Sequence, residues 1–580
     1  MKNRLFALVV LFFPLVTMAQ EITVTVDSVG KLAAQLPDSI RYSMTELKIS
    51  GPIGGNDLKI LQMITSRIKP RKPNEKVLTS LDLAEASICE SKGSFRTKAD
   101  VLPAAMFQGC KSLERVVLPK NMLEVSRSCF SGCVNLKEVE MYEGIRVIGD
   151  YAFSGCSSLK RINLPSELTT IKSHAFDGCT SLAVINLPET VTLIDVAAFA
   201  NCKMLERFDF NNAAIQTVSN NTFSKCERLS TIELPSSVTV IGSEAFEDCT
   251  SLESIQMPDA ISDIGNSAFE NCQKLEAIEM ATAHNIGNDA FKGCISLGSV
   301  DIEQVKKIGN SAFEKCTGLS QVVLNGNLES VEAELFAECT SLSSVSLPPS
   351  VKTIGNRAFF NCKTLGSIEL PEGLTRIYDH AFENCTSLKL LVIPNRVKQL
   401  GSDTFSNCTS LDSVDIQGFV DKLERDLFRN CHSLRIVRLP ISLKSIGDNV
   451  FEQCTSLASI TLPISLNSIG DETFSKCASL TSIVIPPACT SIGSSTFREC
   501  TSLARIELPP AIKKIGSNAF NKCMSLREVV MGAPTPPNIS SNTFKGVVAA
   551  ACKIIVPKGA RNSYRADKTW TKMPSIIESE

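Results

Sequence analysis

A pattern of apolar and polar positions that repeats every 23 residues organises most of the chain. Phe lies three residues before, and Leu three residues after, each of nineteen cysteines that run from Cys110 to Cys523. Of the eighteen intervals between these cysteines, fifteen are 23 residues long, two are 22 and one is 24. A fixed period of this length is typical of an array of stacked supersecondary units.

One unit, residues 249–271, predicts a short strand followed by turns. Its alternation Leu252-x-x-Ile255-x-Met257 is typical of a strand with one buried side, and the proline that follows cannot donate to a β-ladder. Gly265 has counterparts in ten other units, where we expect a tight turn with positive φ. The residues from there to the next cysteine suffice for one helical turn at most.

A single unit of this kind cannot bury its own apolar side chains, whereas stacked copies can. We therefore predict a solenoid of the α/β class with about twenty 23-residue coils. It has a parallel β-sheet on one face and short turns or single-turn helices on the other. Neighbouring strands of such a sheet lie about 4.8 Å apart, and Phe at a fixed place in every coil predicts a continuous stack of rings.

The pattern I-G-x-x-A-F-x-x-C-x-S-L-x-x-I-x-L-P closely resembles the BspA-like leucine-rich repeat of bacterial secreted and cell-surface proteins. Residues 241–258 reproduce it with Met257 in place of the last Leu, and the resemblance covers residues 107–531. The strand half also matches the general leucine-rich-repeat signature, whereas the second half departs from it. The resemblance implies a leucine-rich-repeat solenoid and a role in adhesion or host interaction, which for some members includes binding of extracellular matrix components.

Both ends of the chain break the pattern. In residues 1–19 two basic residues precede an apolar stretch, which predicts a signal peptide. Residues 20–106 contain only imperfect strand phrases and predict an N-terminal cap with degenerate repeats, ahead of the repeats at 107–531. Residues 532–580 predict a partial repeat and a C-terminal cap, in which Tyr564 and Trp570 cover the last coil.

The predicted leader indicates export, so we expect a bacterial protein that is secreted, held at the cell surface or periplasmic. No later stretch has 18 uninterrupted apolar residues, and we therefore expect no transmembrane span. Lys and Arg number 59 and Asp and Glu 61, which gives a formal charge of −2. Without a basic excess, the chain is not expected to bind nucleic acid.

Twenty-three cysteines in an exported protein would ordinarily suggest disulfides. Here nineteen of them form one column whose parallel Cβ vectors do not suit the dihedral angle of a disulfide, and an odd number cannot pair completely. Only four histidines accompany them, and no zinc-binding spacing is present. We predict a reduced, buried ladder of thiols that pack as small apolar groups, and we expect no metal and no cofactor.

Catalysis needs unlike residues brought together, and a repeat supplies the opposite. The sequence contains no nucleophile elbow, no phosphate-binding glycine loop and no H-E-x-x-H motif. His174 and His380 occupy the same variable position of the repeat and are interpreted as surface-loop residues. We therefore expect that the protein is not an enzyme.

If the strands line a concave face, the positions five and seven residues after each cysteine point outward and can bind a ligand. Four carboxylates and one amide occupy the second position in consecutive coils: Asp209, Glu233, Gln256, Glu279 and Asp301. Like charges on adjacent strands are unfavourable, so one hypothesis is a site for a cationic partner or for divalent cations that bridge to one. The other interpretation is a solvated strand surface.

Three apolar residues also occupy outward positions, which makes them candidates for an apolar contact: Leu390, Val392 and Ile436. Together the variable positions favour an adhesion or recognition protein that binds an extracellular protein or glycan. The alternative function is a structural or scaffolding repeat array of the cell envelope without a specific ligand. The identity of the ligand and the oligomeric state do not follow from the sequence.

Overall fold

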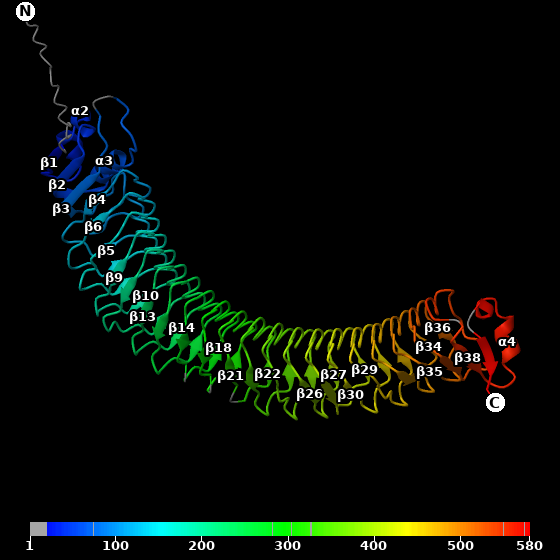
Figure 1. The fold of residues 1–580 in the computed structure, drawn as a ribbon. Coiled ribbons are helices and arrows are strands. Elements are labelled where there is room, and N and C mark those ends of the chain that lie inside the picture. Colours follow the sequence, from blue (N-terminus) through cyan, green and yellow to red (C-terminus); the bar gives the residue numbers. More distant parts are fainter. Residues whose placement is uncertain are drawn as a thin grey trace, which may run out of the picture. The chain divides into compact units, whose positions relative to one another are not determined.

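The computed structural model describes residues 20–72, 75–280, 282–302, 304–324, 327–548, 550–572 and 575–579. The predicted signal peptide, residues 1–19, lies outside this described part of the chain. The chain divides into two compact units, Met1–Ala213 and Ala214–Glu580, which we call unit 1 and unit 2. The division falls inside the one 24-residue interval of the repeat. Each unit is a stack of coils with successive strands side by side (Figure 1).

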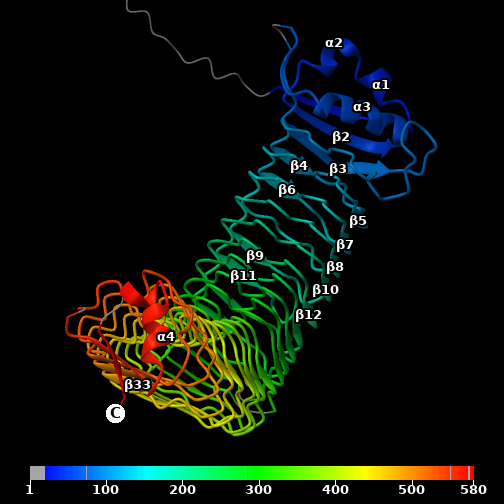
Figure 2. The same ribbon diagram turned by 90° about the vertical axis from the view of Figure 1, so that its right-hand side faces the viewer.

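Unit 1 begins with three long strands and three helices. These are β1 (Glu21–Thr25), α1 (Leu32–Gln35), α2 (Asp38–Arg41), β2 (Glu46–Ile53), α3 (Gly55–Thr65) and β3 (Ser80–Ile88). The strands form where the sequence shows its imperfect strand phrases, and the helices lie beside β2 (Figure 2). The helices α1 and α2 have four residues each, too few to display a helical period. In contrast, α3 buries Leu58, Leu61 and Ile64 at a helical spacing that is visible in the sequence.

A buried carboxylate ties this first segment together. Asp57 in the first turn of α3 is fully buried and accepts hydrogen bonds from the backbone N–H groups of Gly30 (2.7 Å), Leu32 (3.0 Å) and Gly54 (2.9 Å). A carboxylate is favoured at this place because the N–H groups at the start of a helix have no partner within the helix. Asp57 therefore fixes the start of α3 and the start of α1 at once.

Most of the remaining coils of unit 1 contain two short strands, and in the coil that begins at Cys156 the first strand is reduced to a single bridge between Arg161 and Val184. The first strand lies where the sequence predicts it, in β4 (Arg115–Val117), β6 (Glu138–Glu140), β9 (Val184–Asn186) and β11 (Arg207–Asp209). The second strand lies about seven residues further on, in β5 (Glu124–Val125), β7 (Val147–Ile148), β8 (Thr170–Ile171) and β10 (Leu193–Ile194). First strands pair only with first strands, and second strands only with second strands, always in parallel.

Unit 2 repeats this arrangement over more coils. Its first strands are β13 (Thr231–Glu233), β15 (Ser254–Gln256), β17 (Ala277–Ile278), β19 (Ser299–Val300), β21 (Gln321–Val323), β23 (Ser344–Ser346), β26 (Leu390–Ile393), β28 (Ser413–Ile416), β30 (Ile436–Arg438), β33 (Ser482–Val484), β35 (Arg505–Leu508), β37 (Glu528–Met531), β38 (Lys553–Val556) and β39 (Ser575–Glu578). Its second strands are β12 (Thr217–Val218), β14 (Val240–Ile241), β16 (Asp263–Ile264), β18 (Asn285–Ile286), β20 (Lys307–Ile308), β22 (Ser330–Val331), β24 (Thr353–Ile354), β25 (Arg376–Ile377), β27 (Gln399–Leu400), β29 (Lys422–Leu423), β31 (Ser445–Ile446), β32 (Ser468–Ile469), β34 (Ser491–Ile492) and β36 (Lys514–Ile515). Beside its last strands lie α4 (Arg561–Ala566) and the 3₁₀ turn η1 (Trp570–Lys572).

The solenoid predicted from the sequence is confirmed, and turns rather than helices complete its coils. Over the described residues between α3 and α4 no helix forms. The reason lies in two backbone positions per coil that adopt positive φ, such as Ser267 at 51° and Asn271 at 60°. A right-handed helix cannot continue through such residues. The second strand of each coil, two residues long in the repeats, is an addition that the sequence pattern does not predict.

The predicted phenylalanine stack is confirmed within each unit. Ring centroids of successive coils lie 5.2–5.4 Å apart from Phe107 to Phe199, and 5.0–5.8 Å apart from Phe223 to Phe544. Trp570 ends the second stack with its ring centroid 6.1 Å from that of Phe544. The buried Trp570 and Tyr564 donate hydrogen bonds of 2.8 Å to backbone carbonyls of residues 537 and 533, so both cover the last coil as predicted.

Glycine is required at this position of the repeat for a different reason from the one we expected. The prediction of positive φ at Gly265 is wrong, because its φ lies outside that region. A Cβ at Gly265 would instead lie 2.5 Å from the backbone N of Ser243 and 2.6 Å from the carbonyl carbon of Gly242, both in the preceding coil. Glycine is needed here because two backbones approach each other closely.

The residue after this glycine links consecutive coils of unit 2. The side-chain oxygen of Asn266 accepts a 2.9 Å hydrogen bond from the backbone N–H of Asn288, and Asn288 does the same for Asn310. Asp448 and Asp471 act in the same way further along, so the side-chain oxygen of Asn or Asp satisfies a backbone N–H of the next coil. The glycine and the residue after it thus serve one purpose, the close stacking of coils.

The close approach at Gly265 generates a stability prediction. We expect Gly265→Ala to lower the local free energy of unfolding by about 1–3 kcal/mol, because a methyl group is forced against backbone atoms. Gly298→Ala is the matched control, since its nearest atom would lie at 3.9 Å. Hydrogen exchange of the amides in the coils around each site measures the effect. Equal exchange in the two variants would contradict the stated role of Gly265.

Candidate functional site

The outward side chains of the first strands form the surface that the sequence predicts for binding, here called the strand face. In β13 the side chains of Thr231 and Glu233 are exposed, and that of Ile232 between them is buried. In β15 the same holds for Ser254 and Gln256. The predicted outward direction of positions five and seven after each cysteine is therefore confirmed in these coils.

The five residues of the predicted acidic series are divided between the two units. Asp209 belongs to unit 1, where Arg207 lies 3.1 Å from its carboxylate and the backbone N–H of Asn211 donates to it at 2.9 Å. In unit 2, Glu233 lies directly beside Gln256 in the paired strands β13 and β15.

Glu279 and Asp301 directly follow β17 and β19, and both are exposed. Throughout the described ranges no group of three or more acidic, His or Cys residues is placed to hold a metal ion. The hypothesis of a cationic partner, or of divalent cations that bridge to one, stays a prediction.

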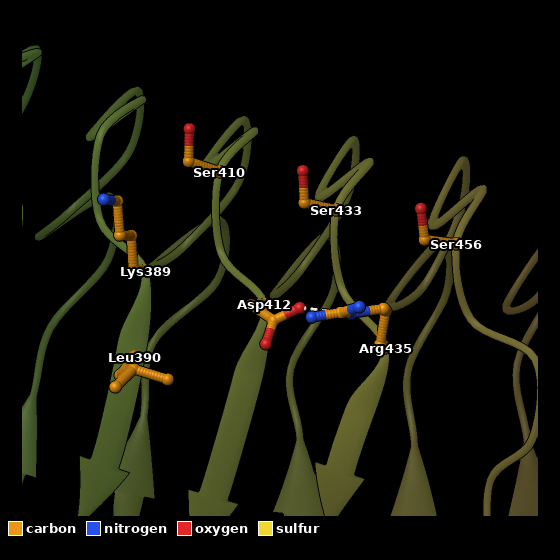
Figure 3. Close-up of a pocket in the computed structure, with 7 residues that line it drawn as sticks. All are labelled: Lys389, Leu390, Ser410, Asp412, Ser433, Arg435 and Ser456. Carbon is orange, nitrogen blue, oxygen red and sulfur yellow. Dashed lines mark hydrogen bonds and ion pairs between the residues drawn. The ribbon is translucent and has the colours of Figure 1, made fainter.

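Leu390, one of the three predicted apolar residues, lines a hollow of the strand face in unit 2. The hollow has a volume of about 590 Å³. It is lined by Lys389, Leu390, Ser410, Asp412, Ser433, Arg435 and Ser456 (Figure 3). Three of these, at 389, 412 and 435, stand immediately before β26, β28 and β30, and the serines lie on the turns above them.

Side-chain length on three neighbouring strands explains why a hollow forms here. The register of β26, β28 and β30 places Leu390, Ser413 and Ile436 side by side in one row. The middle strand therefore carries a short side chain between two longer ones. Asp412 is likewise shorter than the Lys389 and Arg435 that flank it, so the middle coil forms the floor and its two neighbours form the walls.

The hollow carries two cations and one carboxylate. The guanidinium Nε of Arg435 donates to Oδ1 of Asp412 at 2.5 Å. This hydrogen bond lowers the pKa of Asp412 and raises that of Arg435, so both groups stay charged. Within the described chain the ammonium group of Lys389 has no recorded ion pair, and Arg435 keeps four of its five N–H donors after the bond to Asp412.

The three predicted apolar residues lie on β26 and β30, two strands of one sheet with β28 between them. Leu390 is 60% exposed, Val392 51% and Ile436 52%, although each belongs to a strand. Leu390 and Val392 point the same way from β26, and Ile436 stands two strands away on β30 in the same row as Leu390. A single exposed apolar residue needs no explanation, but a contiguous group of them is typical of an interaction surface.

Three further apolar residues escaped the sequence interpretation. Phe419, Ile441 and Ile464 are 71%, 88% and 80% exposed and lie between the first-strand and second-strand positions of three consecutive coils. The signal was present, because the corresponding turns of neighbouring coils carry Glu372, Asn395 or proline. The apolar character of this part of unit 2 thus extends from the strands to the adjoining turns.

A second, smaller hollow occurs in unit 1. It has a volume of about 420 Å³ and is lined by Lys137, Glu138, Lys160 and Arg161. These residues stand four and five positions after their ladder cysteines, the level at which residues 389, 390, 412 and 435 stand in unit 2. Both hollows therefore form where the chain enters the first strand, and both contain more cations than carboxylates.

The cysteine ladder is the remaining candidate for a chemical role. The environment of its thiols indicates instead that they pack as part of the core. The 23 cysteines form no disulfide with one another, and those of the ladder are buried. Most ladder thiols donate a hydrogen bond of 3.0–3.3 Å to the carbonyl of the Phe in the preceding coil, as Cys408 does to Phe382. The predicted buried and unbridged ladder is confirmed.

Burial also makes these thiols unreactive. Desolvation raises the pKa of Cys408 to about 12, and the pKa values of most other ladder thiols rise at least as far for the same reason. Because the thiolate is the reactive form, such thiols are poor nucleophiles near neutral pH. Cys89, which is only half-buried, lies outside the ladder.

Thiol labelling tests this description. In the native protein at pH 8 we expect a thiol reagent to modify Cys89 first and the ladder cysteines only after denaturation, because only Cys89 is accessible. Mass spectrometry of digested protein identifies the labelled positions. Rapid labelling of several ladder cysteines in the folded protein would show that the ladder is open.

The same pKa shifts predict a loss of stability in alkali. A thiol with a raised pKa in the folded state stabilises the fold below its ordinary pKa of 9.0, and this contribution falls as the pH rises above that value. Each shifted thiol then removes about 1.4 kcal/mol per pH unit. Denaturant unfolding at pH 8, 9.5 and 10.5 measures the trend, and Cys408→Ala should make it shallower. A variant with an unchanged slope would speak against the ladder as its source.

Within the described chain none of the helices combines the length and apolar character that a membrane crossing needs. The repeats match a known protein family. The family described as "BspA type Leucine rich repeat region (6 copies)" matches residues 100–227, 216–343, 306–435 and 421–549. These overlapping ranges cover well over half of the chain. No curated protein matches it.

Several solved structures are similar to the chain. A leucine-rich repeat protein from Bacteroides ovatus is 23% identical and has a TM-score of 0.29, with 84% of this chain and 90% of that chain covered. A leucine rich cell surface protein from Faecalibacterium prausnitzii is 24% identical with a TM-score of 0.33, and the match covers 61% of this chain and 86% of that chain. The pneumococcal vaccine antigen PcpA is 14% identical with a TM-score of 0.27, and the match covers 92% and 89%.

Proposed function

Because the chain belongs to the BspA-type leucine-rich repeat family, we propose that it is a non-catalytic binding protein that recognises an extracellular protein or glycan through its strand face. The proposal includes export by the predicted signal peptide, residues 1–19, and a place at the cell surface or in the surrounding medium. Adhesion is the form of recognition that fits such a location. Among repeat proteins of this kind, binding and scaffolding are the usual roles.

One observation carries the proposal, the exposed apolar patch of Leu390, Val392 and Ile436 beside the hollow. A solvated strand surface has no need of three apolar side chains that are each more than half exposed. The ammonium group of Lys389 and the serine hydroxyls add polar groups that can orient a ligand. Apolar area beside a few directed polar groups is the usual composition of a binding surface.

The proposal that the protein is non-catalytic rests on the environments of its thiols and histidines. The thiols are buried and donate to backbone carbonyls. His174 and His380, which share one position of the repeat, each lie next to a carboxylate three residues further on. Such pairs between a half-exposed histidine and its own coil are structural in character.

Binding by the mature chain tests the proposal. We expect the protein to bind a component of an array of extracellular matrix proteins and glycans. The triple substitution Leu390→Asp, Val392→Asp and Ile436→Asp should weaken that binding by about tenfold or more, since it removes the apolar contact and adds three charges. Surface plasmon resonance with the captured component measures the difference.

A matched control adds the same charge elsewhere on the strand face. Thr231→Asp, Ser344→Asp and Ser346→Asp alter three other exposed strand positions of unit 2 and should leave binding unchanged. Equal binding by both triple variants would place recognition outside the patch. A mature chain that binds nothing on the array or on intact host cells would favour the structural or scaffolding alternative.

A further inference from the structure

Charged and apolar groups around the hollow of unit 2 occupy equivalent positions on two coils that are separated by one coil. Lys389 and Arg435 hold equivalent positions two coils apart, and so do Leu390 and Ile436. The coil between them carries the short Asp412 and Ser413. Since neighbouring strands lie about 4.8 Å apart, equivalent positions two coils apart are separated by about 9.6 Å along the stack.

A row of hydroxyl groups runs along the same hollow at half that spacing. Ser410, Ser433 and Ser456 belong to three consecutive coils and form the rim above the charged residues (Figure 3). Within the described part of the chain, no hydrogen bond of these three hydroxyls is recorded. Each hydroxyl can donate one hydrogen bond and accept two, so the row offers one polar contact per coil.

The charges of the hollow select an anionic ligand. Lys389 has no recorded ion pair within the described ranges, and Arg435 uses one N–H donor on Asp412. A ligand carboxylate can therefore contact each cation without displacing Asp412. The floor residue Asp412 repels further negative charge midway between them, which favours a ligand whose charges are two coils apart.

We propose that this hollow binds an acidic polysaccharide that lies along the stack with a carboxylate on every second sugar. Successive sugars of an extended polysaccharide follow one another at nearly the spacing of the coils. Its hydroxyls face the serine row, alternate carboxylates face Lys389 and Arg435, and the C–H faces of its rings rest on Leu390 and Ile436. The assignment rests on the proposed function, because it names the ligand class of the same surface.

An acidic protein segment fits the hollow less well. An extended peptide advances about 3.4 Å per residue, so side chains on one side recur at about 6.8 Å, which differs from the two-coil spacing of the backbone positions that carry Lys389 and Arg435. An amphipathic helix matches the spacing better but needs an apolar groove, whereas six of the seven lining residues are polar. The polar lining and the spacing together favour the polysaccharide.

Titration with defined oligosaccharides tests this assignment. The probe is a hyaluronan octasaccharide, which carries a carboxylate on every second sugar. We expect the mature chain to bind it, and the double variant Lys389→Gln with Arg435→Gln to bind about tenfold more weakly or worse, because two charge-assisted contacts are lost. Asp412→Asn should strengthen binding, since it removes a negative charge that repels the carboxylates of the ligand.

Two comparisons make the test specific. Arg396→Gln with Lys398→Gln removes two exposed cations from the turn and second-strand side of the same coil as Lys389, and should leave binding unchanged. A carboxyl-reduced octasaccharide should bind at least about tenfold more weakly, since its charges are absent. Oligoglutamate of the same charge should also bind more weakly.

The assignment is overturned if the octasaccharide does not bind, if the Lys389 and Arg435 variant binds it as well as the native chain, or if oligoglutamate binds equally well. Its failure can be told apart from failure of the proposed function. If array binding still depends on Leu390, Val392 and Ile436 while the octasaccharide fails, only the ligand class is wrong. If neither binding depends on these residues, the proposed function fails as well.

Discussion

The contact between one coil and the next is the constraint on which the rest of this structure depends. Each coil is too small to bury its apolar side chains alone, and stacking on its neighbours supplies the missing core. The Phe rings meet at 5.0–5.8 Å in unit 2, and the thiol of the next coil donates to the Phe carbonyl. At the glycine the two backbones come so close that no Cβ fits. Positions that make these contacts cannot vary without cost to the stack.

Function is therefore confined to positions that the stack leaves free. On the strand face every coil repeats the same backbone, and only side-chain length and charge differ between coils. A hollow arises where short side chains, Asp412 and Ser413, stand between longer ones on both sides. The exposed apolar patch arises on the same strands. Recognition in such a protein depends on how neighbouring coils combine, because no single coil contains a complete site.

The residues that fill the core could be predicted from the sequence, because their fixed positions within the repeat are enough to reveal them. Phe, Leu and Cys at fixed spacing correctly indicated a solenoid, a ring stack, a buried thiol ladder and outward strand positions. The reason why residue 265 is a glycine was predicted wrongly. In the sequence, a glycine that a close approach between coils requires looks the same as a glycine that a turn requires. The hollow was missed although residues 389, 412 and 435 are 23 positions apart, because its shape depends on comparing side chains across coils. Among the residues singled out from the sequence, only Leu390, Val392 and Ile436 indicated this part of the strand face.

Transfer of the binding surface to other coils tests the central claim most directly. The residues four, five and seven positions after the ladder cysteine in the coils containing β26, β28 and β30 would replace the residues at the same positions of three other coils. These positions are 320, 321 and 323, then 343, 344 and 346, and then 366, 367 and 369, in a chain whose native hollow carries Lys389→Gln and Arg435→Gln. Binding of the hyaluronan octasaccharide is then measured by calorimetry. If stacked coils are interchangeable supports for variable side chains, binding returns at the new place. A folded graft that does not bind would contradict this account.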